Sequence, residues 1–201
     1  FPKRSSTNPQ ELVFAAKKIH SLSSEREKII RDPHLYFIVS FSDKLFWEPI
    51  QKTIKNLELS IVEIIDGKTV KAALRKDKYE WFLYALPKKS NYIEQLKETS
   101  CYEKIDAQLI EELRNQPDKS DWFSFELSNL SGIENAEHIL KAISLYIAEK
   151  NLGSNVKECY LSKTLFILSA HVKYSAVTEI AEQVEAISKV ARIPKISVEI
   201  N

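Results

Sequence analysis

The stretch WFSFELS at residues 122–128 is the clearest indication of the fold, because apolar and polar side chains alternate along it from Phe123 to Ser128. Successive side chains of a β-strand point to opposite faces of the sheet, so this period of two predicts a strand with one buried face. The expected inner residues are Phe123, Phe125 and Leu127, and the expected outer residues are Trp122, Ser124, Glu126 and Ser128. Such a strand needs helices to cover its apolar face.

The residues after this strand predict the remaining elements of one compact unit. They are a helix over Ala136–Leu152, a hairpin of Val156–Leu161 and Leu165–Val172, a helix over Val177–Ala191 and a strand over Lys195–Ile200. Gly153 is expected to be the left-handed residue that ends the first helix. In the last strand, Ser197 and Glu199 are expected on the outer face of the sheet.

The first half of the chain predicts a similar series of elements. They are a strand over Leu35–Phe41, a helix from Ser42-Asp43 to about Asn56, strands over Leu59–Ile65 and Thr69–Leu74, and a short helix from Asp77 to Leu86. Asp66-Gly67 is a hairpin turn signal between the two later strands. The following residues, Asn91–Asn115, are expected to be mostly helical, with a possible short strand at Ser100–Ile105.

The order strand, helix, strand, strand, helix, strand thus occurs twice, and it is complete in the second half and lacks a clear last strand in the first. This order is typical of the ferredoxin-like fold, in which both helices cover one face of an antiparallel sheet. The sequence therefore predicts an α+β protein with two tandem ferredoxin-like units, at residues 34–117 and 118–201. Helical spacing over Pro9–Arg31, with a break near Ser23, predicts N-terminal helices in residues 1–33.

Each predicted sheet has a second face that helices do not cover. In the second unit this face is polar, whereas in the first unit Tyr36 and Ile38, with Val62 and Ile64 as neighbours, make it apolar. Two interpretations follow: the N-terminal helices or the other unit cover these residues, or they form a docking surface for a partner protein. The four residues are the predicted partner-binding site.

The composition of the chain argues against nucleic acid binding, glycine-rich ligand-binding loops and membrane-spanning segments. The 201 residues carry a net charge of +1, which argues against nucleic acid as a partner. Only three glycines are present, so no phosphate-binding loop, nucleophile elbow or dinucleotide fingerprint can be assembled. The longest apolar run, around residues 165–170, is too short to span a membrane.

The residues that most often carry chemistry are scattered. His20, His34, His138 and His171 show no metal-ligand spacing, and Cys101 and Cys159 are expected to be reduced, half-buried cysteines. No nucleophile with a neighbouring base can be identified. We therefore expect no catalytic residues, no metal site and no cofactor. Because the chain starts with Phe1-Pro2 and no Met, we interpret it as a piece of a longer protein.

The stretch DPHLYFIVSFSDKLFWEPIQKTIKNLELSIVEIIDGKTVKAALRKDKYEWFLYAL, residues 32–86, resembles part of a known family. It is similar to the non-catalytic N-terminal region of large, cytosolic, bacterial subtilisin-like serine proteases. The matching stretches are Leu57–Ile65, Val70–Leu74 and Lys78–Ala85, followed by CYEKIDAQLIEELRN at 101–115 and the strand that starts at Trp122-Phe123. The resemblance covers about Asp32 to Leu127, and what the two sequences share is the pattern of apolar positions.

The resemblance implies a cytoplasmic protein that acts by binding. Ferredoxin-like prodomains of subtilisin-like proteases assist folding and inhibit the enzyme, with an open sheet face laid on the catalytic domain. The implied partner is the protease catalytic domain of the same polypeptide or another protein, and the implied role is folding and inhibition or the recruitment of substrates and partners. The catalytic Asp, His and Ser would then lie beyond Asn201, because no matching motif occurs in this chain.

Two alternatives stay open. Tandem ferredoxin-like units also describe RNA-binding endoribonucleases that process CRISPR repeats, but those enzymes need a glycine-rich loop near the C-terminus. The corresponding segment here, SKVARIPK at residues 188–195, contains no glycine. The second alternative is a regulatory module that binds a small ligand between the two units, and only the predicted architecture favours it.

Overall fold

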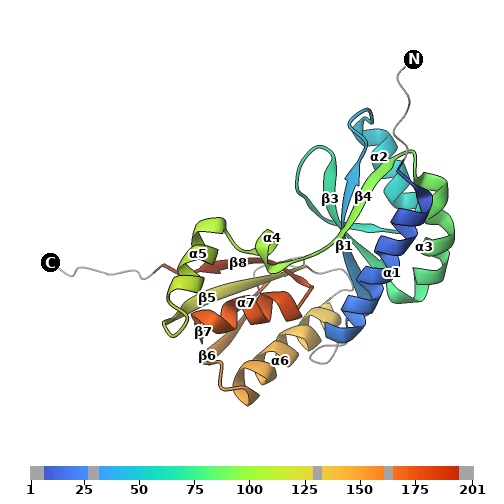
Figure 1. The fold of residues 1–201 in the computed structure, drawn as a ribbon. Helices are drawn as coiled ribbons and strands as arrows, with labels where there is room; N and C mark the ends of the chain where they lie inside the picture. The colour runs from blue at the N-terminus through green and yellow to red at the C-terminus, as the bar shows by residue number, and fades with distance from the viewer. Residues whose placement is uncertain (1–6, 27–31, 129–132, 161–164, 195–201) are drawn as a thin grey trace. The chain divides into compact units, whose positions relative to one another are not determined.

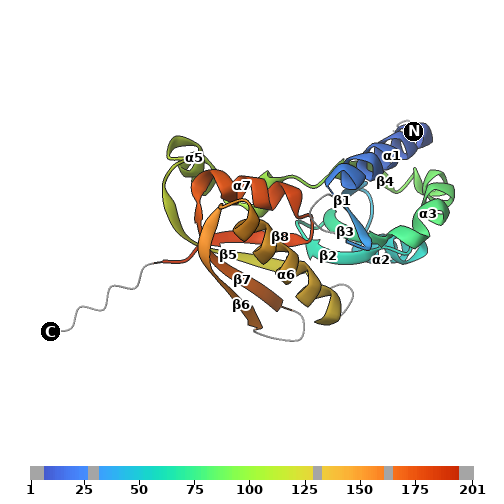
Figure 2. The ribbon, with the colours of Figure 1, turned by 90° about the horizontal axis from the view of Figure 1, so that it is seen from below.

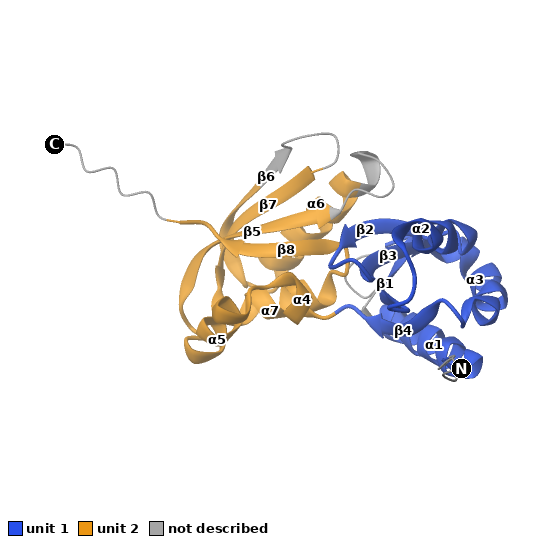
Figure 3. Cartoon of the chain, turned by 90° about the horizontal axis from the view of Figure 1, so that it is seen from above, with its two compact units in different colours: residues 1–99 blue, residues 100–201 orange. Residues whose placement is uncertain are grey.

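The computed structural model describes residues 7–26, 32–128, 133–160 and 165–194. The chain has an α+β fold with two four-stranded antiparallel sheets (Figure 1). Its contacts divide it into two compact units, residues 1–99 and 100–201, which Figure 3 shows in different colours. The unit boundary therefore falls after residue 99, whereas the sequence predicts it after residue 117.

The first unit contains one sheet and the helices that cover one face of it. Its elements are α1 (Pro9–Arg26), β1 (His34–Phe41), α2 (Trp47–Asn56), β2 (Ser60–Ile64), β3 (Thr69–Arg75), the 3₁₀ turn η1 (Lys76–Lys78), α3 (Tyr79–Ala85), the 3₁₀ turn η2 (Leu86–Lys89) and β4 (Ile93–Glu98). The strand order is β2-β3-β1-β4, and every neighbouring pair is antiparallel.

The core of the first unit lies between the sheet and its helices. Alternate β1 side chains, including Phe37 and Val39, are fully buried there, and the Phe37 ring stacks on Phe82 of α3 with centroids 5.3 Å apart. Helix α1 adds Leu12, Ala16 and Ile19 to the same core. It is continuous through Ser23 to Arg26, so the predicted break near Ser23 is wrong.

Helix α2 begins later than predicted. Ser42 and Asp43 do not cap it; the residue before the helix is Phe46, whose side chain makes no capping hydrogen bond. The later start places Pro49 in the first turn, where its missing N–H has no intrahelical partner to lose. The tolerance for proline in the first turn therefore accounts for the start of α2 at Trp47, and not at the predicted capping residues Ser42 and Asp43.

The region Asn91–Asn115 differs most from the prediction. Residues Ile93–Glu98 form strand β4, which pairs with β1, and the expected strand at Ser100–Ile105 is instead the single helical turn α4 (Cys101–Lys104). The β4 sequence IEQLKE is rich in residues that favour helices, so its pairing with β1 overrides local preference. The first unit thus has the fourth strand that the sequence analysis did not locate.

The second unit repeats this plan and adds two short helices before its first strand. Its elements are α4, α5 (Ala107–Asn115), β5 (Ser120–Ser128), α6 (Ile133–Glu149), β6 (Gly153–Tyr160), β7 (Leu165–Lys173), α7 (Tyr174–Gln183) and β8 (Ile187–Arg192). The strand order is β6-β7-β5-β8, again antiparallel throughout. Helices α6 and α7 lie on the same face of this sheet (Figure 2).

The predicted helix Val177–Ala191 is wrong beyond Gln183. The chain leaves the helix at Val184, whose backbone is extended, and Ile187–Arg192 forms strand β8 beside β5. The buried residues Val184, Ile187 and Val190 are three apart, a spacing that also fits a helix, and this caused the error. The strand predicted over Lys195–Ile200, with Ser197 and Glu199, lies outside the described residues.

Gly153 does not end α6. The left-handed residue after that helix is Asn151, with φ 52°, a conformation that asparagine tolerates. Gly153 instead starts β6, where an added Cβ would lie 2.3 Å from the carbonyl oxygen of His171 on β7. Its small size permits the close approach of these two strands.

Helices α4 and α5 belong to the second unit because buried polar contacts tie them to its core. The buried ammonium of Lys104 donates to the carbonyl oxygens of Ala181 and Val184, at 2.5 and 2.9 Å. These carbonyls lie at the C-terminal end of α7, where a positive charge is favourable. Ile105 also forms a parallel bridge with Val190 of β8.

The two sheets share the same pairing register. In the first sheet, Phe37–Phe41 of β1 pair with β4, which contains one extra residue, Glu94. In the second sheet, Phe123–Leu127 of β5 pair with β8, which also contains one extra residue, Ser188. The hairpins also match, since β2 and β6 each carry one extra residue opposite β3 and β7. Ile38 therefore occupies the position in the first sheet that Ser124 occupies in the second.

Candidate functional site

Two of the four predicted partner-binding residues, Tyr36 and Ile38, lie on β1 with their side chains on the face of the sheet opposite the helices. In the register of the sheet Tyr36 faces Ala73 and Ile38 faces Lys71, both on β3. We call these four residues the outer face of the first sheet. All four are buried, with Tyr36 1% and Ile38 6% exposed. This burial agrees with the first of the two interpretations, in which Tyr36 and Ile38 are covered.

Helix α1 does not provide this cover. Its buried residues pack into the core on the opposite side of the sheet, together with Phe37 and Val39. The sequence analysis named the N-terminal helices as one possible cover for Tyr36, and the position of α1 excludes the described helix from that role.

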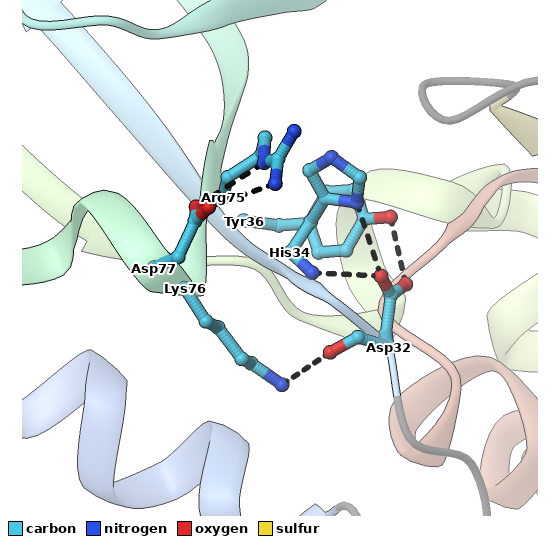
Figure 4. Close-up of polar contacts among 6 residues, drawn as sticks. All are labelled: Asp32, His34, Tyr36, Arg75, Lys76 and Asp77. Carbon is cyan, nitrogen blue, oxygen red and sulfur yellow. Dashed lines mark hydrogen bonds and ion pairs between the residues drawn. The ribbon is translucent and has the colours of Figure 1, made fainter.

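A polar cluster closes the end of the outer face where β1 begins (Figure 4). The carboxylate of Asp32 accepts hydrogen bonds from the His34 backbone N–H at 2.9 Å and from the Tyr36 hydroxyl at 2.8 Å. The His34 ring nitrogen Nδ1 lies 3.3 Å from the same carboxylate. This turn is typical of Asp before proline, here Pro33, because the side chain binds the backbone two residues later.

Lysine side chains on β3 and η1 extend this cluster. The Lys76 ammonium donates to the Asp32 carbonyl oxygen at 2.5 Å, and the Lys76 backbone N–H donates to Pro33 O at 2.8 Å. The buried Lys71 ammonium lies 5.6 Å from the centroid of the Tyr36 ring, within the range of a cation–π contact. These contacts join the start of β1 to the end of β3.

The combination of Asp, His and Tyr resembles a catalytic set in composition, but its geometry favours a structural role. The Tyr36 hydroxyl donates a hydrogen bond to the Asp32 carboxylate and the ring is buried, so neither group is presented to a substrate. The nearby Arg75–Asp77 ion pair, at 2.7 Å, is exposed and contributes little to stability. We interpret the cluster as the anchor that fixes β1 against β3.

Val62 and Ile64, the other two predicted partner-binding residues, do not join Tyr36 and Ile38 in one patch. Both lie on β2, an outer strand of the sheet, where Val62 is the extra residue of a β-bulge. Ile64 faces Val70, whose side chain belongs to the core on the helix side. The structure therefore separates the predicted site into a buried pair on β1 and an accessible pair on β2.

The accessible part is larger than the sequence analysis proposed. Ile64 is 56% exposed, and its neighbours Ile61 and Ile65 are 36% and 45% exposed. The sequence analysis treated residues 59–65 as one apolar strand and did not distinguish an edge from a central strand. The signal was the Asp66-Gly67 turn, which pairs this strand with β3 and leaves its other side without a sequence neighbour.

The outer face of the second sheet has a different character. Trp122, Ser124 and Glu126 of β5 are half-buried, whereas Phe123, Phe125 and Leu127 are buried. The Trp122 ring packs edge-on against His171 at 5.9 Å, and the Lys157 ammonium lies 5.5 Å from its centroid. This face is polar and accessible, as the alternation in residues 122–128 predicts.

The thiol of Cys101 is free and half-buried, and its surroundings do not activate it. Burial raises the pKa of the Cys101 thiol, and the nearby Glu182 carboxylate raises it further. A nucleophilic cysteine needs the opposite shift. In the described part of the chain, no three His, Cys, Asp or Glu side chains are grouped so that they could hold a metal ion.

No helix among the described residues has the length and apolar character needed to cross a membrane. Comparison with protein-family models, curated protein sequences and solved structures finds no match for this chain.

Proposed function

We propose that each unit has the ferredoxin-like fold and that the chain is the non-catalytic N-terminal region of a subtilisin-like serine protease. The order of strands and helices in each unit and the central position of β1-β3 and β5-β7 agree with the ferredoxin-like plan. The shared register and matching extra residues of the two sheets support it further. This repeated plan is the observation that carries the proposal, because prodomains of such proteases use the same fold.

The proposed role is binding, either as a folding and inhibitory module or as a recruiting module. The proposed partner is the protease catalytic domain of the same polypeptide or another protein, and the proposed location is the cytoplasm. The buried positions of His34 and Tyr36 and the raised pKa of the Cys101 thiol argue against catalytic use of these residues.

The test is to purify the 201-residue chain and to add it in increasing amounts to the catalytic domain of its parent protease. The chain alone is expected to hydrolyse neither casein nor structured RNA, and it is expected to form a complex with the protease in size-exclusion chromatography. Inhibition of peptide hydrolysis would assign the inhibitory role, and a complex without inhibition the recruiting role. Steady turnover by the chain itself, retained through further purification, would contradict the proposal.

One observation favours the RNA-binding alternative. Trp81 and Tyr84 of α3 are exposed, their rings lie 5.7 Å apart, and the Lys88 ammonium lies 3.6 Å from the Tyr84 centroid. Aromatic rings beside lysines are typical of single-strand binding surfaces, although the net charge of +1 is low for that function. Binding of single-stranded RNA that is lost in Trp81→Ala and Tyr84→Ala would support this alternative.

A further inference from the structure

Strand β2 is the accessible edge of the first sheet. In the order β2-β3-β1-β4 it has a described strand on one side only. Ile65 N–H donates to Thr69 O at 3.0 Å, and in an antiparallel ladder the next pair, Ile64 with Val70, is not hydrogen-bonded. The N–H and C=O of Ile64 therefore point away from β3, toward the open side of β2. An edge of this kind is a template for another extended chain.

Two other sheet edges in the described part of the chain are covered. Helix α1 packs beside β4, and the Thr7 hydroxyl donates to Glu94 O of β4 at 3.1 Å. On the second sheet, Ile105 bridges the outer side of β8. At β6 the left-handed Asn155, with φ 52°, lies within the bulge and interrupts a regular edge. The side of β2 away from β3 shows no such protection in the described residues.

The side chains of this edge add apolar surface to the backbone groups. Ile61, Ile64 and Ile65, which we call the β2 isoleucines, are each at least 36% exposed. Side chains at such an edge supply pockets and specificity when an incoming strand adds to a sheet, while the main chain supplies hydrogen bonds. The bulge at Val62 limits regular pairing to the Glu63–Ile65 end of the strand.

The charge of this edge selects its partner. Residues 58–66 contain Glu58, Glu63 and Asp66 and no lysine or arginine. Glu58 is paired with Lys78 at 3.2 Å, and Glu63 and Asp66 are exposed, with Glu63 opposite the buried Lys71 in the register of the sheet. A second copy of this chain paired through β2 would bring both Glu63 and both Asp66 side chains along one short ladder, and this like-charge contact disfavours a homodimer. A strand with lysines or arginines between apolar residues has the complementary charge.

We infer that the β2 edge binds an extended segment of a partner polypeptide, with alternating basic and apolar residues, by strand addition. This inference rests on the proposed binding role and places the contact at β2, away from the buried Tyr36 and Ile38. The β2 isoleucines contact the apolar residues of the segment, Glu63 attracts its basic residues, and Ile64 forms the main-chain hydrogen bonds.

The test uses the full 201-residue chain and a fluorescein-labelled octapeptide of alternating lysine and valine. Fluorescence anisotropy at low salt is expected to show binding. A peptide with alternating glutamate and valine, and a lysine–valine peptide N-methylated at every second residue, are each expected to bind at least about tenfold more weakly. The glutamate–valine peptide tests whether binding needs the positive charge of the lysines. The N-methylated peptide tests whether binding needs the main-chain N–H donors.

Matched variants locate the contact. Glu63→Lys is expected to weaken binding of the lysine–valine peptide at least about fivefold, whereas Glu126→Lys, with the same change in net charge on the second sheet, leaves it within about twofold. Equal effects of the two variants, equal binding of the methylated peptide, or no binding at all would overturn the inference. A chain that forms the protease complex but binds no peptide overturns this inference alone, while catalytic turnover by the chain overturns the proposed function alone.

Discussion

The outer faces of the two sheets differ although the sheets are built alike. At matching positions of the central strand, the first sheet has Ile38, which is buried, and the second has Ser124, which is half-buried. Burial along β1 is nearly continuous, whereas along β5 buried and half-buried residues alternate. The same strand plan therefore accommodates a central strand buried on both faces in the first unit and a central strand with a polar, accessible face in the second.

The two sheets also differ in the accessible apolar side chains that their strands carry. In the first unit the apolar outer face is buried, and the exposed isoleucines lie at the β2 edge. In the second unit the accessible outer face carries Ser124, Glu126 and Trp122, which need no apolar partner. A binding surface in the first unit is therefore expected at an edge, and not on the face that the sequence analysis proposed.

The largest expected effect comes from placing a charge at the matching positions. Ile38→Glu puts a carboxylate into a buried apolar site and is expected to reduce the free energy of unfolding by at least about 3 kcal/mol, with a fall in melting temperature of roughly 10 °C. Ser124→Glu is expected to cost less than about 1 kcal/mol because that side chain reaches water. Urea denaturation and thermal melts followed by circular dichroism measure both. Similar losses in the two variants would remove the distinction between the faces.

The glycines of the two hairpins give the next largest effect. Gly153→Ala places a Cβ against the backbone of His171 and is expected to cost about 2 kcal/mol or more. Gly67→Ala, in the hairpin of the first unit, meets nothing within 4 Å and its φ lies outside the left-handed region, so a change within about 0.5 kcal/mol is expected. Urea denaturation of the two variants in parallel checks this. A large loss for Gly67→Ala would show that the first hairpin is tighter than described.

The smallest expected effect concerns α4, which the first unit lacks. Burial and the Glu182 carboxylate raise the pKa of the Cys101 thiol, so less thiolate is present at pH 8 than in an ordinary cysteine. Alkylation of Cys101 by iodoacetamide, followed by mass spectrometry of its peptide, is expected to be slow in the folded chain and to rise in rate with pH. Glu182→Gln removes one cause of the raised pKa and is expected to speed alkylation at pH 8. The same rate in the folded chain and in urea would show that α4 is not held on α7.

Much of the fold could be predicted from the sequence wherever the spacing of apolar residues fitted either a helix or a strand but not both. The alternation in residues 122–128 and the Asp66-Gly67 turn led to strands that the structure contains. Errors arose where two interpretations were equally good. Val184, Ile187 and Val190 fit a helical stripe, yet Ile187 and Val190 belong to a strand, and IEQLKE at residues 93–98 has helical preference but pairs with β1. Tertiary pairing decided both cases, and local sequence does not contain it.

The candidate site could be predicted only where the pattern of apolar residues along one strand was sufficient. Apolar residues on both sides of β1 indicated that Tyr36 and Ile38 need cover, and both are buried. The Asp66-Gly67 turn indicates that β2 pairs with β3, but the exposure of the β2 isoleucines depends on what packs against the other side of β2, and local sequence does not contain this. The Asp32 cluster was also missed, because Lys71 and Lys76 meet Asp32 and Tyr36 only after β3 pairs with β1.

Oxidative footprinting measures whether the outer face of the first sheet is buried. Hydroxyl radicals modify accessible aromatic rings, and mass spectrometry resolves the modified residues. Tyr84, which is 62% exposed, is expected to be modified readily, and Trp122 on the second sheet measurably, while Tyr36 stays as protected as the fully buried Tyr174. Modification of Tyr36 at a rate near that of Tyr84 in the folded chain would contradict the account, since the outer face of the first sheet would then be open to solvent.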